Sequence, residues 1–338
     1  MKDTILTGVR VNETPTLGNF LGAYMPMVQL AQKYANTHNI NMFIPDLHSI
    51  TTPINYSELQ QNIIDGVRYY IAAGLDTSQV NMYRQSYIPA HSELTWILDC
   101  FSYTGELGRM IQFKEKSAEH PDGVTMGLFN YPVLMAVDIL LYGAKYVPVG
   151  EDQYQHLEIT RDIAIRFNNK FGEIFVIPVP TKEQSKFMNR SEGLRVRSLT
   201  DPEKKMSKSS RSENSKISLD DNPETAAKKI MSATTDSVGL IQFDMFNQPG
   251  VSNLLQILAL LQARSLQEVV GEWAGQTNYG ELKTTVAAEV ENFLADFQAK
   301  VAKISDQDVL KALEAGEKRV TPIANAKLLE VQKAVGLR

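Results

Sequence analysis

The residues of this chain best suited to chemistry lie in one short polar run, Lys204 to Ser210, which reads KKMSKSS. The run sets three lysines beside three serines, a composition too polar for a protein core and suited to an anionic ligand such as a phosphate. Asp201-Pro202 stands just upstream, and because proline disfavours helical backbone at the residue before it, the run is predicted to be a loop. A solvated cluster of surface lysines is the alternative that composition leaves open.

A second polar segment, Thr16-Leu17-Gly18-Asn19, lies between a predicted strand over Thr4 to Val9 and an apolar, helix-like run that reaches about Tyr34. The backbone N–H groups at the start of a helix have no intrahelical partner, so a strand, a turn and a helix start suit a nucleotide phosphate. Gly18 permits a close approach of the ligand, and Asn19 can donate a hydrogen bond to a phosphate oxygen.

Asp138 interrupts the apolar stretch Val133 to Leu141 on a helix that must be largely buried. A carboxylate in that position needs a partner. Helical spacing places Tyr131, Met135 and Tyr142 near its face, which makes an aromatic and thioether lining with one acceptor. An indole matches it, because it carries one N–H donor on a large apolar ring. A structural aspartate paired with an arginine or a backbone N–H is the other interpretation.

Polar residues also follow two of the predicted strands. Gly150-Glu151-Asp152-Gln153 puts two carboxylates beside a glycine, which suits ribose hydroxyls, and the Gln153 carbonyl can accept from an amino group. The same acidic residues could instead stabilise the N-terminus of the helix predicted over Tyr154 to Phe167. His48 follows the second strand, and a ligand contact and a local backbone cap both remain open for it.

The elements that must position these residues alternate along the first two thirds of the chain. Helix-patterned stretches separate five strand-like segments, namely Thr4 to Val9, Asn41 to Pro45, Val80 to Arg84, Lys145 to Val149 and Ile174 to Val179. This alternation predicts an α/β fold with a Rossmann-like, doubly wound parallel sheet. Ligands of such sheets bind just past the carboxyl ends of the strands, where the polar residues stand.

One helix carries clear boundary signals, since Ser57 and Gln60 form a capping-box pattern before Glu58 to Ala73 and Gly74 suits the C-terminal cap. Beyond about Ile217 the strand signals fade, and the predicted helices there are Asn222 to Ser232, Asn253 to Ala263, Gly280 to Lys303 and Asp306 to Leu337. We therefore predict a Rossmann-like domain over residues 1–215 and a helical domain over residues 216–338.

Composition excludes several classes of protein. The chain has 338 residues, a formal net charge of −5 and 43% hydrophobic residues, which argues against disorder, against a DNA-binding protein and against general nucleic-acid affinity. Any RNA contact must use local basic patches. The apolar runs are too short to cross a bilayer, and Met1-Lys2-Asp3 does not open a secretory leader, so a cytoplasmic protein is expected. Cys100 is the only cysteine, which excludes internal disulfides, and we expect it to be buried.

Lys205 to Ser209 (KMSKS) resembles the lysine signature of the class I aminoacyl-tRNA synthetases, and Thr16 to Asn19 resembles the version of their N-terminal signature that is typical of the tryptophan branch. Longer segments, collinear to about Leu255, are similar to the bacterial tryptophanyl-tRNA synthetases: QSYIPAHSEL, GELGRMIQFKEKSA, YPVLMAVDILLY, VPVGEDQYQHLEITRDIAIRFN, LTDPEKKMSKS and PGVSNLL. One turn, Arg10 to Glu13, departs from the family pattern by lacking a proline and a glycine.

The resemblance implies the roles of individual residues. The catalytic group would be Lys114, Lys205, Lys208 and Asn19. ATP would be held by Arg10, Val11, Asn12, Gly18, Asn19, Gly150, Glu151, Asp152, Val196, Lys205, Met206, Ser207, Lys208 and Ser209. The amino acid would contact Tyr131, Met135, Asp138, Val147, Val149, Gln153 and His48. The resemblance implies no metal ligand on the protein.

The resemblance further implies that L-tryptophan is activated with ATP and Mg²⁺, and that tryptophanyl-adenylate then transfers its acyl group to tRNA(Trp). It implies a homodimer, a helical domain of the anticodon-binding type, and a last helix that packs back on the catalytic domain. Two alternatives stay open at this point. One is a tyrosyl-tRNA synthetase-like enzyme, and the other is a non-catalytic paralogue that binds tryptophan or RNA.

Overall fold

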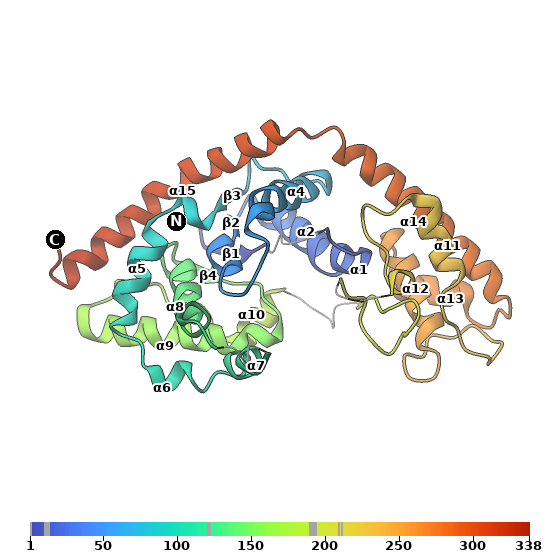
Figure 1. The fold of residues 1–338 in the computed structure, drawn as a ribbon, viewed down its shortest axis with the longest axis horizontal. Helices are drawn as coiled ribbons and strands as arrows, with labels where there is room; N and C mark the ends of the chain where they lie inside the picture. Colours follow the sequence, from blue (N-terminus) through green and yellow to red (C-terminus); the bar gives the residue numbers. More distant parts are fainter. Residues whose placement is uncertain (1, 10–13, 120–122, 189–194, 209, 211) are drawn as a thin grey trace.

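The computed structural model describes residues 2–9, 14–119, 123–188, 195–208, 210 and 212–338. Its centre is a sheet of four parallel strands in the order β3-β2-β1-β4 (Figure 1). The strands are β1 (Thr4–Gly8), β2 (Asn39–Ile44), β3 (Asn81–Arg84) and β4 (Ala144–Tyr146). The order reverses between β1 and β4, which is the place where doubly wound sheets bind ligands.

The fifth predicted strand, Ile174 to Val179, is wrong. The segment runs beside β4, but the structure gives it one backbone hydrogen bond to that strand, from Val179 N to Lys145 O at 3.1 Å. Pro178 and Pro180 supply no N–H for a ladder. The Gln184 side chain bridges the two segments where a backbone ladder is missing. Its Nε2 donates to Lys145 O at 3.1 Å and to Val179 O at 3.2 Å.

The two faces of the sheet are buried in two separate apolar clusters. Met42 and Ile44 on β2 face one cluster with α2 (Met25–Tyr34) and α4 (Leu59–Ala72), whereas Phe43 faces the other. That second cluster contains residues of α5 (Ala90–Asp99), α8 (Met126–Leu140) and α9 (Tyr154–Phe171). Strand alternation thus places consecutive residues against opposite helical layers. Shorter helices complete this part: α3 (Asp46–Ser49), α6 (Thr104–Leu107), α7 (Ile111–Glu119) and α10 (Thr181–Met188).

The first helical run is divided in three. It consists of α1 (Leu17–Asn19), a π-helical turn over Phe20–Tyr24, and α2, in whose first turn Pro26 lies. A proline has no N–H to donate and crowds the preceding turn, so the wider π turn accommodates it.

The boundary signals of α4 are half confirmed. The predicted capping box of Ser57 and Gln60 is wrong, because Asn55 Oδ1 accepts from Ser57 N at 3.3 Å and caps a 3-10 turn over Tyr56–Glu58 that precedes the helix. Gly74 does end the helix, with a φ of 97° that suits glycine. The Asn55 side chain thus caps the start of this segment in place of the predicted capping box of Ser57 and Gln60.

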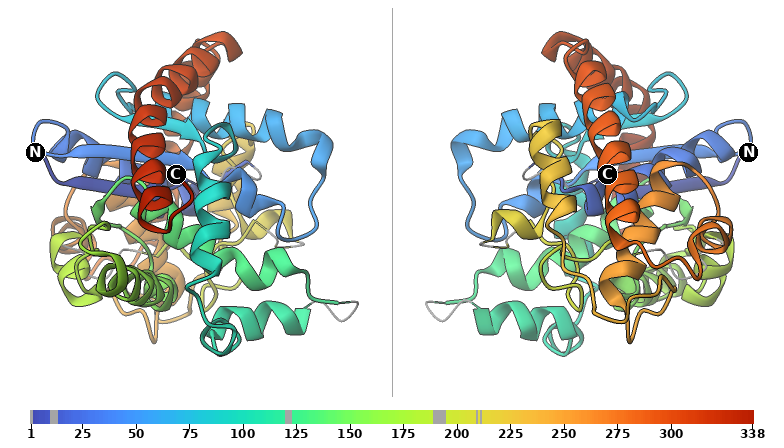
Figure 2. Two further views of the ribbon diagram at one scale, coloured as in Figure 1. Left: turned by 90° about the vertical axis from the view of Figure 1, so that its left-hand side faces the viewer. Right: turned by 90° about the vertical axis from the view of Figure 1, so that its right-hand side faces the viewer.

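The helices predicted after residue 217 are present as α11 (Pro223–Met231), α12 (Pro249–Leu261), α14 (Tyr279–Val301) and α15 (Asp306–Ala334), and α13 (Leu266–Trp273) was missed. They share one apolar cluster with α2 and α4. The views in Figures 1 and 2 show α15 running from this helical region along the sheet. The boundary predicted between residues 215 and 216 stays a prediction.

Helix α15 covers the outer edge of β3, which is an edge strand of the sheet. A Cβ on Gly316 would come within 1.9 Å of the Met82 carbonyl oxygen, so only glycine allows the helix to lie this close. Beside it, Glu317 accepts from Arg84 Nε at 2.6 Å and Nη2 at 3.0 Å, and both side chains are buried. Covering the edge prevents β3 from pairing with another chain.

Cys100 corrects a prediction, because it is exposed and lies at the C-terminal cap of α5, where its Sγ donates to Trp96 O at 3.6 Å. The polar end of a helix, where carbonyls lack partners, is turned to solvent here. Within the described residues, none of the helices combines the length and apolar character needed to cross a membrane.

Candidate active site

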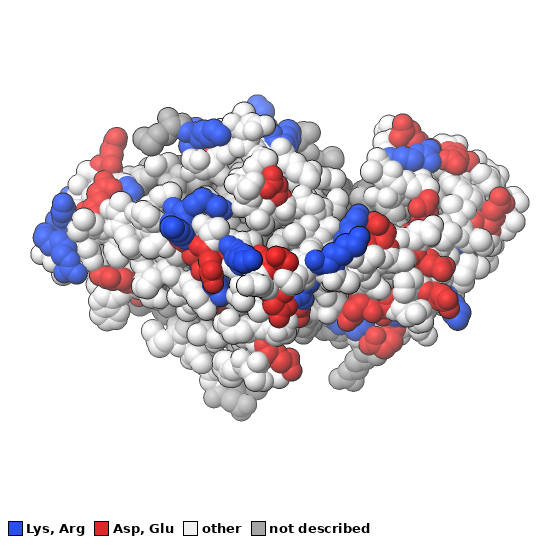
Figure 3. Space-filling model, turned by 90° about the horizontal axis from the view of Figure 1, so that it is seen from above, with Lys and Arg blue, Asp and Glu red and all other residues white. Residues whose placement is uncertain are grey.

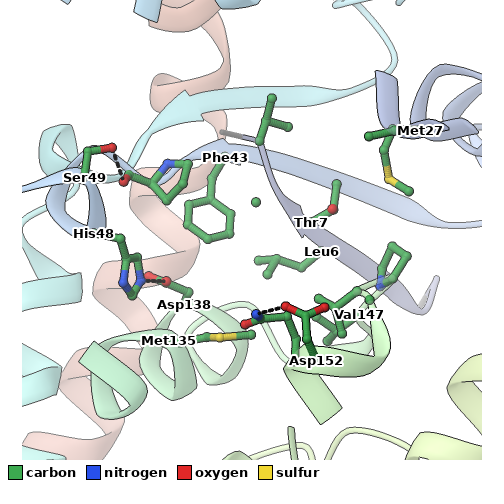
Figure 4. A pocket seen from close by; sticks show the side chains of 18 of the residues that line it. Leu6, Thr7, Met27, Phe43, His48, Ser49, Met135, Asp138, Val147 and Asp152 are labelled. Atoms are coloured by element: carbon green, nitrogen blue, oxygen red, sulfur yellow. Dashed lines mark hydrogen bonds and ion pairs between the residues drawn. The ribbon is translucent and has the colours of Figure 1, made fainter. Parts of the chain in front are cut away.

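One cavity of about 770 Å³ opens at the carboxyl edge of the sheet (Figure 4). Its walls come from the ends of three strands: Gly8 ends β1 and Val9 follows it, Pro45 and His48 follow β2, and residues 147–150 follow β4. The predicted location of the site, past the carboxyl ends of the strands, thus coincides with this cavity.

Asp138 lies at one end of the cavity with its carboxylate fully paired to side chains. Oδ2 accepts from His48 Nε2 at 2.9 Å, and Oδ1 accepts from Gln85 Nε2 at 2.6 Å and His91 Nδ1 at 2.7 Å. Burial by itself raises the pKa of Asp138, but the hydrogen bonds from His48 and His91 outweigh it and hold the pKa below its ordinary value. The carboxylate is therefore an ionised acceptor.

The Asp138 side chain has no solvent exposure, although it lines the cavity. Of its three partners, His48 alone is partly exposed, at 19% of its side chain, and lines the same cavity. Figure 4 shows the His48 ring pointing at Asp138 across the cavity wall. His48 is consequently the partner that covers Oδ2 from the cavity side.

Apolar and aromatic groups surround this end. Tyr131, Met135 and Val147 line it together with Leu6 and Phe43, and the Tyr131 hydroxyl lies 2.9 Å from His156 Nε2. Tyr142, predicted to face the ligand, instead lies behind Asp138, where its hydroxyl is 2.9 Å from His91 Nε2. The lining suits a flat aromatic ring with a single donor.

Asn19 lies at the opposite end of the cavity as part of a capping box. Asn19 N donates to Thr16 Oγ1 at 3.2 Å, while Asn19 Oδ1 accepts from Thr16 N at 3.3 Å and from Thr16 Oγ1 at 2.9 Å. Because Oδ1 is occupied by Thr16, the amide Nδ2 faces away as a donor. The threonine and asparagine of this signature thus fix one another.

The lysine run is a loop, as predicted, on a stem that is bonded to the rest of the protein. Met206 N donates to Val196 O at 3.1 Å and Ser198 N donates to Lys204 O at 2.9 Å, which pairs the two sides of the stem. Lys216 Nζ donates to Lys208 O at 3.0 Å. Lys208 reaches the cavity and lines it with Asn19.

The N-terminal signature and the lysine loop are in direct contact. Leu17 N donates to Ile217 O at 2.8 Å, just after the loop. A Cβ on Gly18 would lie 3.2 Å from Met206 Cβ and 3.3 Å from Val196 Cβ. Gly18 therefore makes room for the stem of the loop, and the approach of a phosphate to it stays a prediction.

The acidic quartet lies at the cavity and directly before α9, and its contact with a ribose stays a prediction. Glu151–Gln153 forms a 3-10 turn that leads into α9, and Gly150, Asp152 and Gln153 line the cavity. Asp152 Oδ2 accepts from Gln153 Nε2 at 2.7 Å and from Gln112 Nε2 at 3.1 Å. With its amide nitrogen engaged, Gln153 has its carbonyl oxygen available as an acceptor.

The cavity gathers most of the predicted site residues from elements far apart in the sequence. Those that line it are Asn19, His48, Tyr131, Met135, Asp138, Val147, Val149, Gly150, Asp152, Gln153 and Lys208. Those that do not are Gly18, Lys114, Glu151, Val196, Lys205, Met206 and Ser207. Val196 and Met206 are buried against Gly18, while Lys114 and Lys205 are exposed. Arg10, Val11, Asn12 and Ser209 lie outside the described residues.

Lys116 is the residue that sequence reasoning missed. It lines the cavity with Gln112, and its Nζ lies 4.7 Å from the centre of the Tyr131 ring. Gln112 and Lys116 are four residues apart on α7 and share a helix face, whereas Lys114 is turned away from it. The four-residue spacing of Gln112 and Lys116 was therefore a signal, present in the sequence, that the two side chains face the same way. Other lining residues, such as Tyr24 and Tyr70, carried none, because they look like ordinary core.

A doubly wound parallel sheet, a cavity at its carboxyl edge, and a lysine loop bonded to an N-terminal turn are the features expected of a class I aminoacyl-tRNA synthetase. The model of the family "tRNA synthetases class I (W and Y)" matches residues 4–295. A tryptophan–tRNA ligase of Caldanaerobacter subterraneus is 45% identical over 333 residues, which cover 98% of this chain and 98% of that relative.

Solved structures agree with the sequence relatives. The tryptophanyl-tRNA synthetase of Mycoplasma pneumoniae matches with a TM-score of 0.81 and 37% identity, covering 100% of this chain and 99% of that one. That of Campylobacter jejuni, complexed with ADP and tryptophan, matches with a TM-score of 0.80 and 30% identity, covering 99% and 100%. The chain belongs to the tryptophan–tRNA ligases. The predicted family, its ligase class and the α/β fold with a helical C-terminal region are confirmed.

Proposed function

We propose that the protein activates L-tryptophan with ATP inside this one cavity. A carboxylate oxygen of tryptophan attacks the α-phosphorus in line, the bond to the bridging oxygen of the β-phosphate breaks, and pyrophosphate leaves. Tryptophanyl-adenylate then gives its acyl group to a terminal ribose hydroxyl of tRNA(Trp), which releases AMP. The observation that carries the proposal is that Asn19 and Lys208 at one end share a single cavity with Asp138 at the other.

The phosphate end would work by positioning and charge. Lys208 and Lys116 both line the cavity and would supply ammonium groups for the negative charge that grows on the departing pyrophosphate. Asn19 Nδ2 adds a neutral donor. Closure of the lysine loop over the nucleotide would bring Lys205 and Ser207 toward the phosphates from their present places outside the cavity. We assign to Lys116 the role that the resemblance gave to Lys114.

The indole end would select the substrate. The indole N–H would donate to Asp138 Oδ2, which requires His48 to give up or share that oxygen, because the carboxylate has no exposure while His48 holds it. Met135 and Tyr131 would contact the ring, and the Gln153 carbonyl would accept from the α-amino group. A buried acceptor that must be paired discriminates more strongly than an apolar wall does.

Magnesium would arrive with the nucleotide. Among the described residues there is no group of three or more His, Cys, Asp or Glu side chains that could hold a metal ion. Mg²⁺ keeps several waters and often binds chiefly to substrate phosphates, so ATP itself suits it as the main ligand. When bound, it would neutralise phosphate charge and supplement the lysines.

We further propose a homodimer that works on tRNA(Trp) in the cytoplasm, as the family resemblance implies. On the face seen in Figure 3, Lys and Arg lie in separate patches between Asp and Glu. That distribution agrees with the overall charge of −5 and supports phosphate contacts through local patches.

Exchange of labelled pyrophosphate into ATP tests the proposal directly. With each of the twenty amino acids offered separately, only tryptophan should support rapid exchange, and chelation of Mg²⁺ should abolish it. Exchange with tyrosine and not with tryptophan would show that the protein is a tyrosyl-tRNA synthetase-like enzyme. Lack of exchange with any amino acid, while tryptophan still binds, would indicate the non-catalytic paralogue.

Asp138→Ala tests the indole end. The variant removes the acceptor and leaves two buried donors and the partly exposed His48 unpaired, so tryptophan affinity should fall about a hundredfold or more. Isothermal titration calorimetry measures it, and ATP affinity on the same sample serves as the control. An unchanged tryptophan Kd would rule out the assignment of Asp138.

A further inference from the structure

The two oxygens of Asp138 are held in different ways. Oδ2 is held by His48, which lines the cavity, whereas Oδ1 is held by Gln85 and His91, which do not. Gln85 and His91 both have no exposure and lie at the end of β3 and in the first turn of α5. A ligand in the cavity therefore cannot touch either residue.

The hydrogen bonds around His91 fix its protons. An ionised Asp138 accepts only, so His91 Nδ1 must carry a hydrogen and donate at 2.7 Å. His91 Nε2 can then accept from the Tyr142 hydroxyl, 2.9 Å away. The ring also packs against Phe43 and Tyr83, at centroid distances of 6.5 Å and 6.3 Å. One tautomer and one orientation thus satisfy the whole chain from Tyr142 to Asp138.

Gln85 is held less completely. Its Nε2 donates to Asp138 Oδ1 at 2.6 Å, but its Oε1 is buried without a hydrogen-bond partner among the described residues. Turning the amide over would point Oε1 at a carboxylate and repel it. A buried, unpaired carbonyl is costly for stability, and such a cost at the back of a binding site indicates a functional constraint.

We propose that Gln85 and His91 are positioning residues that set the selectivity for the indole N–H by fixing Oδ1 of Asp138 in the interior. With Oδ1 saturated, the carboxylate cannot rotate, and Oδ2 is the single acceptor that it presents to the cavity. Without them the carboxylate could turn, pair its oxygens within the protein and accept a ring that lacks the N–H. This inference rests on the proposed function, and it adds residues that never meet the substrate.

The test compares two amino acids in pyrophosphate exchange: tryptophan, and its analogue with sulfur in place of the indole N–H. The selectivity is the ratio of the two kcat/KM values. Gln85→Met removes the donor at nearly constant shape, and the selectivity should fall about tenfold, mainly through the KM for tryptophan.

Gln248→Met is the matched control. Gln248 is also a buried glutamine whose Nε2 donates to an aspartate, Asp236, at 3.0 Å, but it lies at the start of α12 away from the cavity. Its loss should lower the melting temperature and leave the selectivity within roughly twofold of the parent. If Gln85→Met did the same, Gln85 would be merely structural and the proposal would be overturned.

His91 provides an independent arm with a rescue. Asparagine places an amide N–H near the position of Nδ1, so His91→Asn should keep most of the selectivity, while His91→Leu should lose about tenfold. Equal selectivity in the two variants would contradict the role given to the His91 donor. If His91→Leu fails to fold, the comparison of Gln85→Met with Gln248→Met still tests the proposal.

An Asp138→Asn background separates this inference from the proposed function. If Asp138 accepts from the indole but Gln85 acts elsewhere, Gln85→Met would still change the selectivity in that background, and our inference would fail alone. If Asp138→Asn itself leaves the selectivity of the parent intact, the indole assignment fails first. We expect Asp138→Asn to lower the selectivity and Gln85→Met to add nothing to it.

Discussion

The two ends of the cavity are built in opposite ways. At the indole end Asp138 is buried and its oxygens are paired with side chains at 2.6 to 2.9 Å, so the acceptor is in place before any ligand arrives and His48 alone has to yield to the indole. At the phosphate end the stem of the lysine loop is bonded to the protein, yet Lys205 is exposed and only Lys208 of its lysines lines the cavity. Selectivity is thus preformed, whereas the charges for catalysis depend on closure of the loop.

Lys208→Ala should have the largest effect, and it tests the contrast between the indole end and the phosphate end most severely. Adenylate formation should slow by about a thousandfold, because a charge aimed at the transition state is lost, while tryptophan affinity stays the same. Rapid-quench measurement of the adenylate, together with calorimetry, gives both quantities. Near-normal turnover would show that the phosphate end does not depend on this lysine.

The pair Lys116→Ala and Lys114→Ala sharpens the comparison on α7. Lys116 lines the cavity and Lys114 does not, so the first variant should lose roughly ten- to a hundredfold in exchange rate and the second less than about threefold. Steady-state exchange measures both, and each variant is the control for the other. The reverse order would mean that α7 changes its place when ATP binds.

Thr16→Ala should have the smallest effect. It removes the hydroxyl that accepts from Asn19 N and donates to Asn19 Oδ1, and the loss of a cap costs about 1 kcal/mol in the free energy of unfolding. Thr16→Ser keeps the hydroxyl and is the control. Because Asn19 Oδ1 then keeps only the bond from the backbone N of residue 16, the KM for ATP should rise a few fold in the alanine variant and remain unchanged in the serine variant. An equal KM in both would show that Asn19 needs no support.

The family, the strand-turn-helix entrance and the approximate positions of four strands could be predicted from sequence, since periodicity and short signatures are local properties. The fifth strand failed at Pro178 and Pro180, where a glutamine side chain replaced the backbone ladder. The sequence pointed to Lys114 and not to Lys116, because two lysines in one helical turn differ only in the direction they face, and the role of Lys114 stays a prediction. Among the described residues, the predicted cavity lining agrees best with the structure where a motif follows the end of a strand, as at Gly150, Asp152 and Gln153.

The sequence by itself determined which chemical groups the protein possesses: a lysine loop, a capped glycine turn and an aspartate within an apolar helix. Tertiary structure alone decided how they are used. It placed Gly18 against Met206, and it surrounded Asp138 with Gln85, His91 and His48 from three other elements. These contacts join residues 47 to 188 positions apart in the sequence, and no local pattern specifies a partner at such a separation. Packing and the pairing of buried polar groups select it.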